Sequence, residues 1–112
     1  MKKLLLFAAT ALLLLVTTTG EAQGQSSNAQ LQEIMQAAIA FEDVGKADEA
    51  LVKLEEAKKI APDNIDVNYE IAYSYHIKKD YKQTISILMG LVQRKDADDR
   101  IYEMLGNTYP QM

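Results

Sequence analysis

The sequence predicts an all-α fold made of helix-turn-helix hairpins that repeat along the chain. One observation is the spacing of apolar residues in ADEALVKLEEAKKI (47–60), which fall at steps of three and four, the period of an amphipathic helix. A second observation is that side chains of the same kind recur at one constant separation along the chain. This separation, called the repeat step, is the one between Phe41 and Tyr75. The rows that recur at this step are the aromatic Phe41, Tyr75 and Tyr109, the small Ala38, Ala72 and Gly106, and the apolar Leu54 and Leu88.

Five helices are expected, at about residues 29–44, 47–60, 64–78, 81–94 and 98–109. Gly45 is expected to end the first helix, because glycine adopts the left-handed backbone conformation of a helix C-terminus without a Cβ penalty. Pro62 stops the second helix, and Asp63 and Asn64 are suited to cap the third. The small row is expected to let the two helices of a hairpin approach closely.

These rows resemble the tetratricopeptide repeat, a unit of about 34 residues in which W-x2-L-G-x2-Y is followed by A-x3-F and then by proline. Residues 31–64 match with Ile34, Ala37, Ala38, Phe41, Ala50, Leu54 and Pro62. Residues 65–98 match with Asn68, Ile71, Ala72, Tyr75, Thr84 and Leu88, with Asp96 where the proline belongs. Residues 99–112 supply Tyr102, Leu105, Gly106 and Tyr109 of an incomplete repeat. The resemblance implies a tetratricopeptide-type α-solenoid over residues 29–112, with two full repeats and the first helix of a third.

The N-terminus is typical of a bacterial secretory signal peptide. Lys2 and Lys3 precede an apolar run from Leu4 to Val16, and Gly20-Glu21-Ala22 resembles a cleavage site, so we expect residues 1–22 to be removed after Ala22. The apolar run has 13 residues, whereas a membrane-spanning helix needs about 20. The alternative of an uncleaved anchor is therefore disfavoured. Residues 23–28 are expected to form a flexible leader, and the mature protein to be periplasmic or secreted.

Composition narrows the class of partner. The chain has no cysteine, which excludes disulfides and a lipid anchor on cysteine. Removal of residues 1–22 takes away two lysines and one glutamate, which leaves 10 basic and 15 acidic side chains and a net charge of −5. An acidic chain without a basic stripe is a poor candidate for nucleic acid or anionic lipid, because phosphate neutralisation dominates such binding. No stable membrane insertion is expected after signal cleavage.

The resemblance implies that the first helix of each repeat lines a concave groove that binds a protein or peptide. The groove positions outside the packing rows are held by Gln32, Met35, Gln36, Ile39 and Asp43 in the first repeat, Tyr69, Glu70, Tyr73, His76 and Ile77 in the second, and Arg100, Glu103, Met104 and Asn107 in the third. Tyr75 and Tyr81 are expected in the packing instead. The alternative is that Met35, Ile39 and Tyr73 only pack against neighbouring helices.

Residues for catalysis are scarce. His76 is the only histidine, and the chain has neither a cysteine nor a GxxxxGK[ST] phosphate loop. No enzyme activity, cofactor or metal is therefore expected. Of the positions that hold chaperone tail carboxylates in some members of the family, only Arg100 fits, so that binding mode is not expected.

The sequence favours an exported scaffold that binds proteins or peptides. An alternative is that these repeats begin a larger envelope protein whose activity lies in a further C-terminal part. A third reading is a homodimer, because Ile101, Leu105 and Tyr109 are expected to expose an apolar stripe on the uncovered third-repeat helix.

Overall fold

The structure, a computed structural model, describes residues 26–112. The expected signal peptide and residues 23–25 of the leader lie outside the described residues. The chain is helical from residue 26, so residues 26–28 belong to the first helix and not to a flexible leader. Residues Leu31–Met112 form one compact unit.

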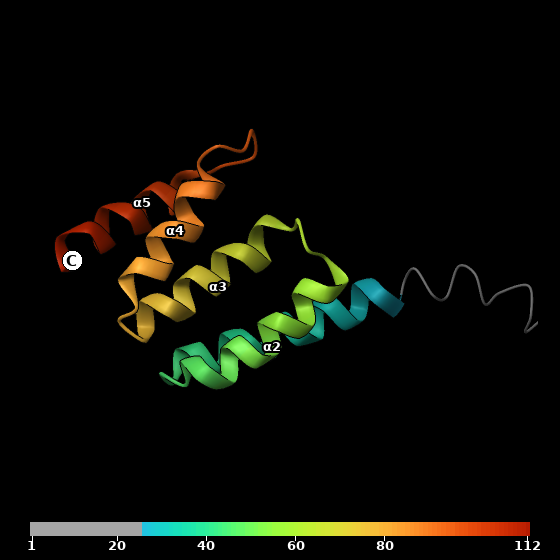
Figure 1. The fold of residues 1–112 in the computed structure, drawn as a ribbon. Coiled ribbons are helices and arrows are strands. Elements are labelled where there is room, and N and C mark those ends of the chain that lie inside the picture. The colour runs from blue at the N-terminus through green and yellow to red at the C-terminus, as the bar shows by residue number, and fades with distance from the viewer. Residues whose placement is uncertain (1–25) are drawn as a thin grey trace, which may run out of the picture. The chain divides into compact units, whose positions relative to one another are not determined.

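The described residues form helices joined by turns and contain no strand, which confirms the all-α class. The helices are the first helix (26–43), α2 (Ala47–Ile60), α3 (Ile65–Ile77), α4 (Tyr81–Leu91), α5 (Asp99–Thr108) and the short 3₁₀ helix η1 (Tyr109–Gln111) (Figure 1). In Figure 1, α3 lies between the first helix and α2 on one side and α4 and α5 on the other. Helix starts recur at the repeat step, from Ala47 to Tyr81 and from Ile65 to Asp99. No helix among residues 26–112 combines the length and the apolar character that a membrane crossing requires.

The turns after the first helix and after α3 have the same geometry. Gly45 has a φ of +77°, and the N–H groups of Gly45 and Lys46 bond back to the carbonyls of Glu42 and Phe41. These are the two hydrogen bonds of a Schellman motif, so the predicted end of the first helix at Gly45 is confirmed. Lys79 occupies the same place after α3 with a φ of +65°, although it carries a side chain.

The start of α3 also follows the prediction. The side chain of Asn64 accepts hydrogen bonds from the N–H groups of Asp66 and Val67, which caps the helix. The end of α4 does not follow it, because the helix stops at Leu91 and not near residue 94. The Arg94 guanidinium bonds both oxygens of Asp96, two residues away, a pairing that the side chains of a helix cannot make.

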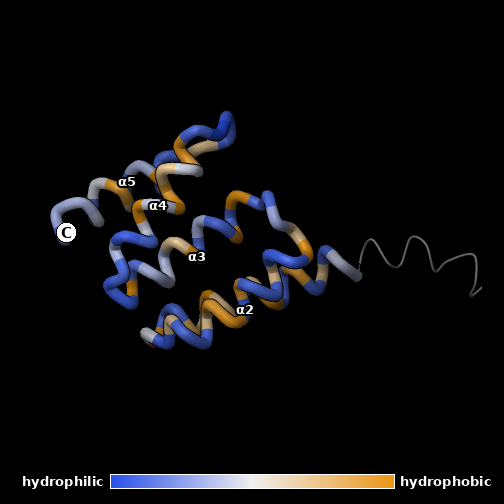
Figure 2. Tube along the Cα trace, in the orientation of Figure 1, coloured by the Kyte–Doolittle hydropathy of each residue, from blue (hydrophilic) through white to orange (hydrophobic). Residues whose placement is uncertain are grey.

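The core consists of two clusters of buried side chains. One contains Ala38, Leu54, Ala57, Val67 and Ile71, and the other contains Ala72, Leu88, Leu91, Ile101, Met104 and Leu105. Moving every member of the first cluster along the chain by the repeat step produces a member of the second, so the same packing unit occurs twice. Figure 2 shows apolar residues recurring along each helix in keeping with this arrangement. Each unit joins three helices, and α3 belongs to both.

This packing overturns the expectation of an apolar stripe made by Ile101, Leu105 and Tyr109. Ile101 is fully buried and Leu105 is 9% exposed, because α5 packs against the hairpin of α3 and α4. In the same way, α3 packs against the hairpin of the first helix and α2. Only Tyr109, at 52%, is exposed as expected. Gly106 is exposed too, and a Cβ built on it would touch nothing, so the expected close approach holds for buried Ala38 and Ala72 but is wrong for Gly106.

Candidate functional site

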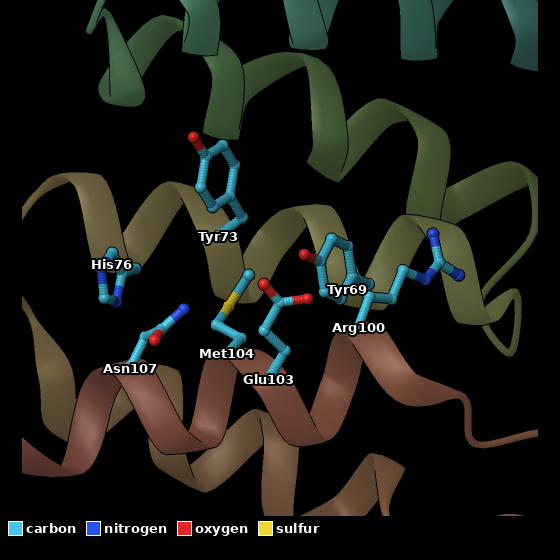
Figure 3. A pocket seen from close by; sticks show the side chains of 7 residues that line it. All are labelled: Tyr69, Tyr73, His76, Arg100, Glu103, Met104 and Asn107. Atoms are coloured by element: carbon cyan, nitrogen blue, oxygen red, sulfur yellow. The ribbon is translucent and has the colours of Figure 1, made fainter.

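A cavity of about 170 Å³ lies between α3 and α5. It is lined by Tyr69, Tyr73 and His76 from α3 and by Arg100, Glu103, Met104 and Asn107 from α5 (Figure 3). Residues spaced by three, four and seven positions share one face of a helix, which is why both helices present these side chains together. In Figure 3, Tyr69 and Arg100 lie together at one end of the site, His76 and Asn107 at the other, and Tyr73 stands at the upper edge.

Arg100 is fixed by three neighbours. Its guanidinium bonds Asp66 of α3 and Asp98, the residue before α5, at 3.0 Å for the latter. It also lies over the Tyr69 ring, with the central carbon 4.6 Å from the ring centre, a cation–π contact. Partial burial lowers the pKa of Arg100, but the hydrogen bonds to Asp66 and Asp98 raise it by more. The positive charge of Arg100 is therefore neutralised within the protein.

Tyr69 is half-buried beneath this guanidinium and packs against the second core cluster. Burial raises the pKa of its phenol, and the nearby Glu70 carboxylate raises it further. Tyr69 is therefore a neutral hydroxyl at physiological pH. Tyr73, one turn further along α3, is 38% exposed and offers its ring to solvent.

His76 is held in one tautomer by its neighbours. Its Nδ1 lies 3.0 Å from Oγ1 of Thr108, which in turn donates its hydrogen to the Met104 carbonyl at 2.6 Å. Because the hydroxyl hydrogen is already used, Nδ1 must be the donor and Thr108 the acceptor. In the neutral ring Nε2 is then a hydrogen-bond acceptor. An edge-to-face contact with the Tyr81 ring, at 5.4 Å between centres, fixes the imidazole further.

This hydrogen-bond direction is opposite to the one that activates a nucleophile, in which the imidazole accepts the hydroxyl hydrogen. Thr108 is also fully buried and so is closed to a substrate. Among residues 26–112, no three histidine, cysteine, aspartate or glutamate side chains gather in a way that could hold a metal ion.

A second polar contact repeats the one at His76, and the sequence analysis missed it. The Ser74 hydroxyl donates to Oε2 of Glu42 at 2.8 Å, and Glu42 is only 4% exposed. Glu42 precedes His76 by the repeat step, and Ser74 precedes Thr108 by the same step, so both junctions between successive first helices carry a polar pair at the same place. Extending the repeating rows to polar residues would have found Glu42.

Burial raises the pKa of Glu42 to about 9, and the adjacent Glu70 carboxylate adds to the effect. Oε1 of Glu42 has no hydrogen-bond partner as long as it carries no proton. A proton on Oε1 would let Glu42 donate a hydrogen bond to Glu70. Glu42 is therefore neutral in the folded protein at pH 7.

Seven of the fourteen groove residues named from the sequence line the cavity. These are Tyr69, Tyr73, His76, Arg100, Glu103, Met104 and Asn107. Of the others, Glu70 is half-buried beside Glu42, and Met35 packs against the first core cluster. The side chains of Gln32, Gln36 and Ile39 are exposed on the first helix and do not line the cavity. Tyr75 and Tyr81 are half-buried, and Tyr75 packs on the first cluster.

Comparison of the chain with family models, curated proteins and solved structures gives no match. The resemblance to tetratricopeptide repeats therefore rests on the residues of this chain alone.

Proposed function

We propose that this protein is an exported tetratricopeptide-type scaffold that binds a protein or peptide segment along the face formed by its successive first helices. The observation that carries the proposal is the cavity between α3 and α5, which gathers two tyrosines, a methionine and several polar groups on that face. Aromatic and methionine side chains supply much contact area and adapt to varied partners.

The recurrence of helix starts, turn geometry and core packing at the repeat step supports the repeat architecture. Ile39, Tyr73 and Asn107 also recur at this step, and all three are exposed. A partner segment that runs across the repeats would meet one of these side chains on each first helix. The proposed site is thus a row of equivalent positions, and the cavity lies where Tyr73 and Asn107 adjoin it.

Export is proposed from the pattern of residues 1–22, and the partner is accordingly sought in the periplasm or outside the cell. No enzymatic step is part of the proposal, since the only imidazole is committed as a donor to buried Thr108. Neither nucleic acid nor anionic lipid is proposed as partner, because the chain is acidic and has no basic stripe to neutralise phosphate groups.

The test is crosslinking and recovery of partners from the producing cells with wild-type protein and with Tyr69→Ala/Tyr73→Ala. We expect the double variant to lose the recovered partner while circular dichroism shows unchanged helicity. Val52→Ala is the control, because Val52 is a 63% exposed side chain of α2 that does not line the cavity. Equal recovery by all three proteins would refute the proposal.

A second proposal concerns the opposite side of α5. Tyr102 and Gly106 of α5 and Tyr109 of the following η1 are exposed, and the Tyr109 hydroxyl donates to the sulfur of Met89 at 3.8 Å. We propose that another structural element covers these exposed residues. In a larger envelope protein, that element would be a further part of the same chain. The intact mass of the protein isolated from its host tests this, since a mass no larger than that of residues 23–112 would contradict it.

A further inference from the structure

We infer that the cavity between α3 and α5 receives a basic side chain, a lysine or arginine of the bound segment. This inference rests on the proposed function, because it assumes that a peptide segment reaches this face. It adds a chemical preference that the resemblance to tetratricopeptide repeats does not imply.

The charges around the cavity favour a cation. Arg100 is paired with two carboxylates, Asp66 and Asp98, so these three groups together carry one negative charge. Glu103 is exposed on the cavity wall and takes part in none of the ion pairs among the described residues. The cavity is therefore surrounded by an excess of negative charge, which attracts a cation and repels an anionic peptide.

The hydrogen-bonding groups agree with the charge. Glu103 offers carboxylate oxygens, Asn107 offers an amide oxygen, and His76 offers Nε2 because its Nδ1 hydrogen goes to Thr108. The strongest donor on the wall, Arg100, is already engaged. Ammonium and guanidinium groups carry donors only, and so they complement a wall that is rich in acceptors.

The aromatic rings supply the third argument. Tyr69 already binds one guanidinium, that of Arg100, over its ring. Tyr73 is 38% exposed, and among the described residues its ring is paired with no cation and no second ring. A basic side chain that enters the cavity can therefore lie against Tyr73 as Arg100 lies against Tyr69, while its charge faces Glu103.

The size of the cavity fits a side-chain head group. Its 170 Å³ is about ten times the 10–15 Å³ that a single water molecule requires. The largely buried Met104 forms an apolar wall for the methylene stem of a lysine or arginine, which such side chains lay along apolar surface.

The experiment is selection of a random displayed-peptide library on the immobilised full-length protein, followed by affinity measurement with the enriched peptides. We expect enriched peptides to share one lysine or arginine. Replacing that arginine by citrulline, its uncharged isostere, is expected to weaken binding about tenfold. The variant Glu103→Gln is expected to weaken binding of the arginine peptide several-fold and that of the citrulline peptide little. Glu55→Gln, which removes an exposed carboxylate of α2, serves as control and is expected to change neither.

Three results would overturn the inference in different ways. Peptides whose binding needs Tyr73 but shows no preference for a basic residue would refute the basic-side-chain preference and leave the proposed function standing. Failure of every peptide to depend on Tyr69 and Tyr73 would refute both. Arginine and citrulline peptides that bind equally to wild type and to Glu103→Gln would also exclude the charge as the cause.

Discussion

Replacing Glu42 by glutamine should change how the stability of the protein depends on pH. Glu42 is 4% exposed, accepts a hydrogen bond from Ser74 and faces the carboxylates of Glu70 and Asp43. Burial is the main cause that raises its pKa from 4.5 to about 9. Glutamine matches the protonated form, because its amide can donate to Glu70 while its oxygen accepts from Ser74.

The magnitude follows from proton linkage. Between pH 4.5 and about 9 the folded protein holds a proton on Glu42 that the unfolded chain has lost. The stabilisation from this proton is fully present below pH 4.5 and disappears as the pH rises to about 9, at about 1.4 kcal/mol per pH unit. Glu42→Gln does not lose it. The difference in free energy of unfolding between Glu42→Gln and wild type should therefore increase by about 3 kcal/mol, in favour of the variant, from pH 4.5 to pH 7.

The assay is urea unfolding followed by circular dichroism at several pH values from 4.5 to 9. The difference in unfolding free energy between Glu42→Gln and wild type should widen steadily with pH. Glu55→Gln, an exposed carboxylate with the same change of charge, should follow the wild-type curve. Parallel curves for wild type and Glu42→Gln would refute the reasoning, because they would mean that Glu42 is ionised alike in both states.

Three further predictions concern the repeated elements. Lys79→Gly should raise the free energy of unfolding by about 1 kcal/mol and Gly45→Ala should lower it by about as much in urea titrations, because both positions have positive φ. Leu54→Ala and Leu88→Ala should each cost about 2–5 kcal/mol by the same assay, since the two leucines are fully buried at equivalent places; a loss confined to one of them would contradict the repeated core. Thr108→Val should cost about 1–2 kcal/mol and alter the ring nitrogen shifts of the histidine in NMR spectra, because the Nδ1 hydrogen loses its acceptor; unchanged shifts would exclude the assigned tautomer.

The sequence predicted the helices well because their signals are local or periodic. Gly45, Pro62 and Asn64 act on their own turns, and their effect does not depend on the rest of the fold. The repeating rows likewise identified buried residues such as Leu54 and Leu88. The predicted end of α4 was wrong. The pairing of Arg94 with Asp96 forms only after the chain has left the helix, so the helical pattern of the sequence does not reveal it.

The site was predictable in part. Helix geometry predicted that Tyr69 and Tyr73 share one face of α3, and the resemblance to tetratricopeptide repeats implied that Arg100 lies in the same groove. All three line the cavity. The ion pair between Arg100 and Asp66 depends on the distance between α3 and α5, which no local pattern reports. The buried state of Glu42 depends in the same way on the packing of the first helix against α3.

The most direct test of the account is site-specific photo-crosslinking in the cells that make the protein. A photoreactive phenylalanine analogue would replace Tyr73 at the cavity, or Val52 on the exposed side of α2. The account predicts a discrete crosslinked partner from position 73 and none from position 52, and loss of that product when Tyr69 is also replaced by alanine. Products from position 52 alone, or from neither position, would contradict the claim that this face binds a partner.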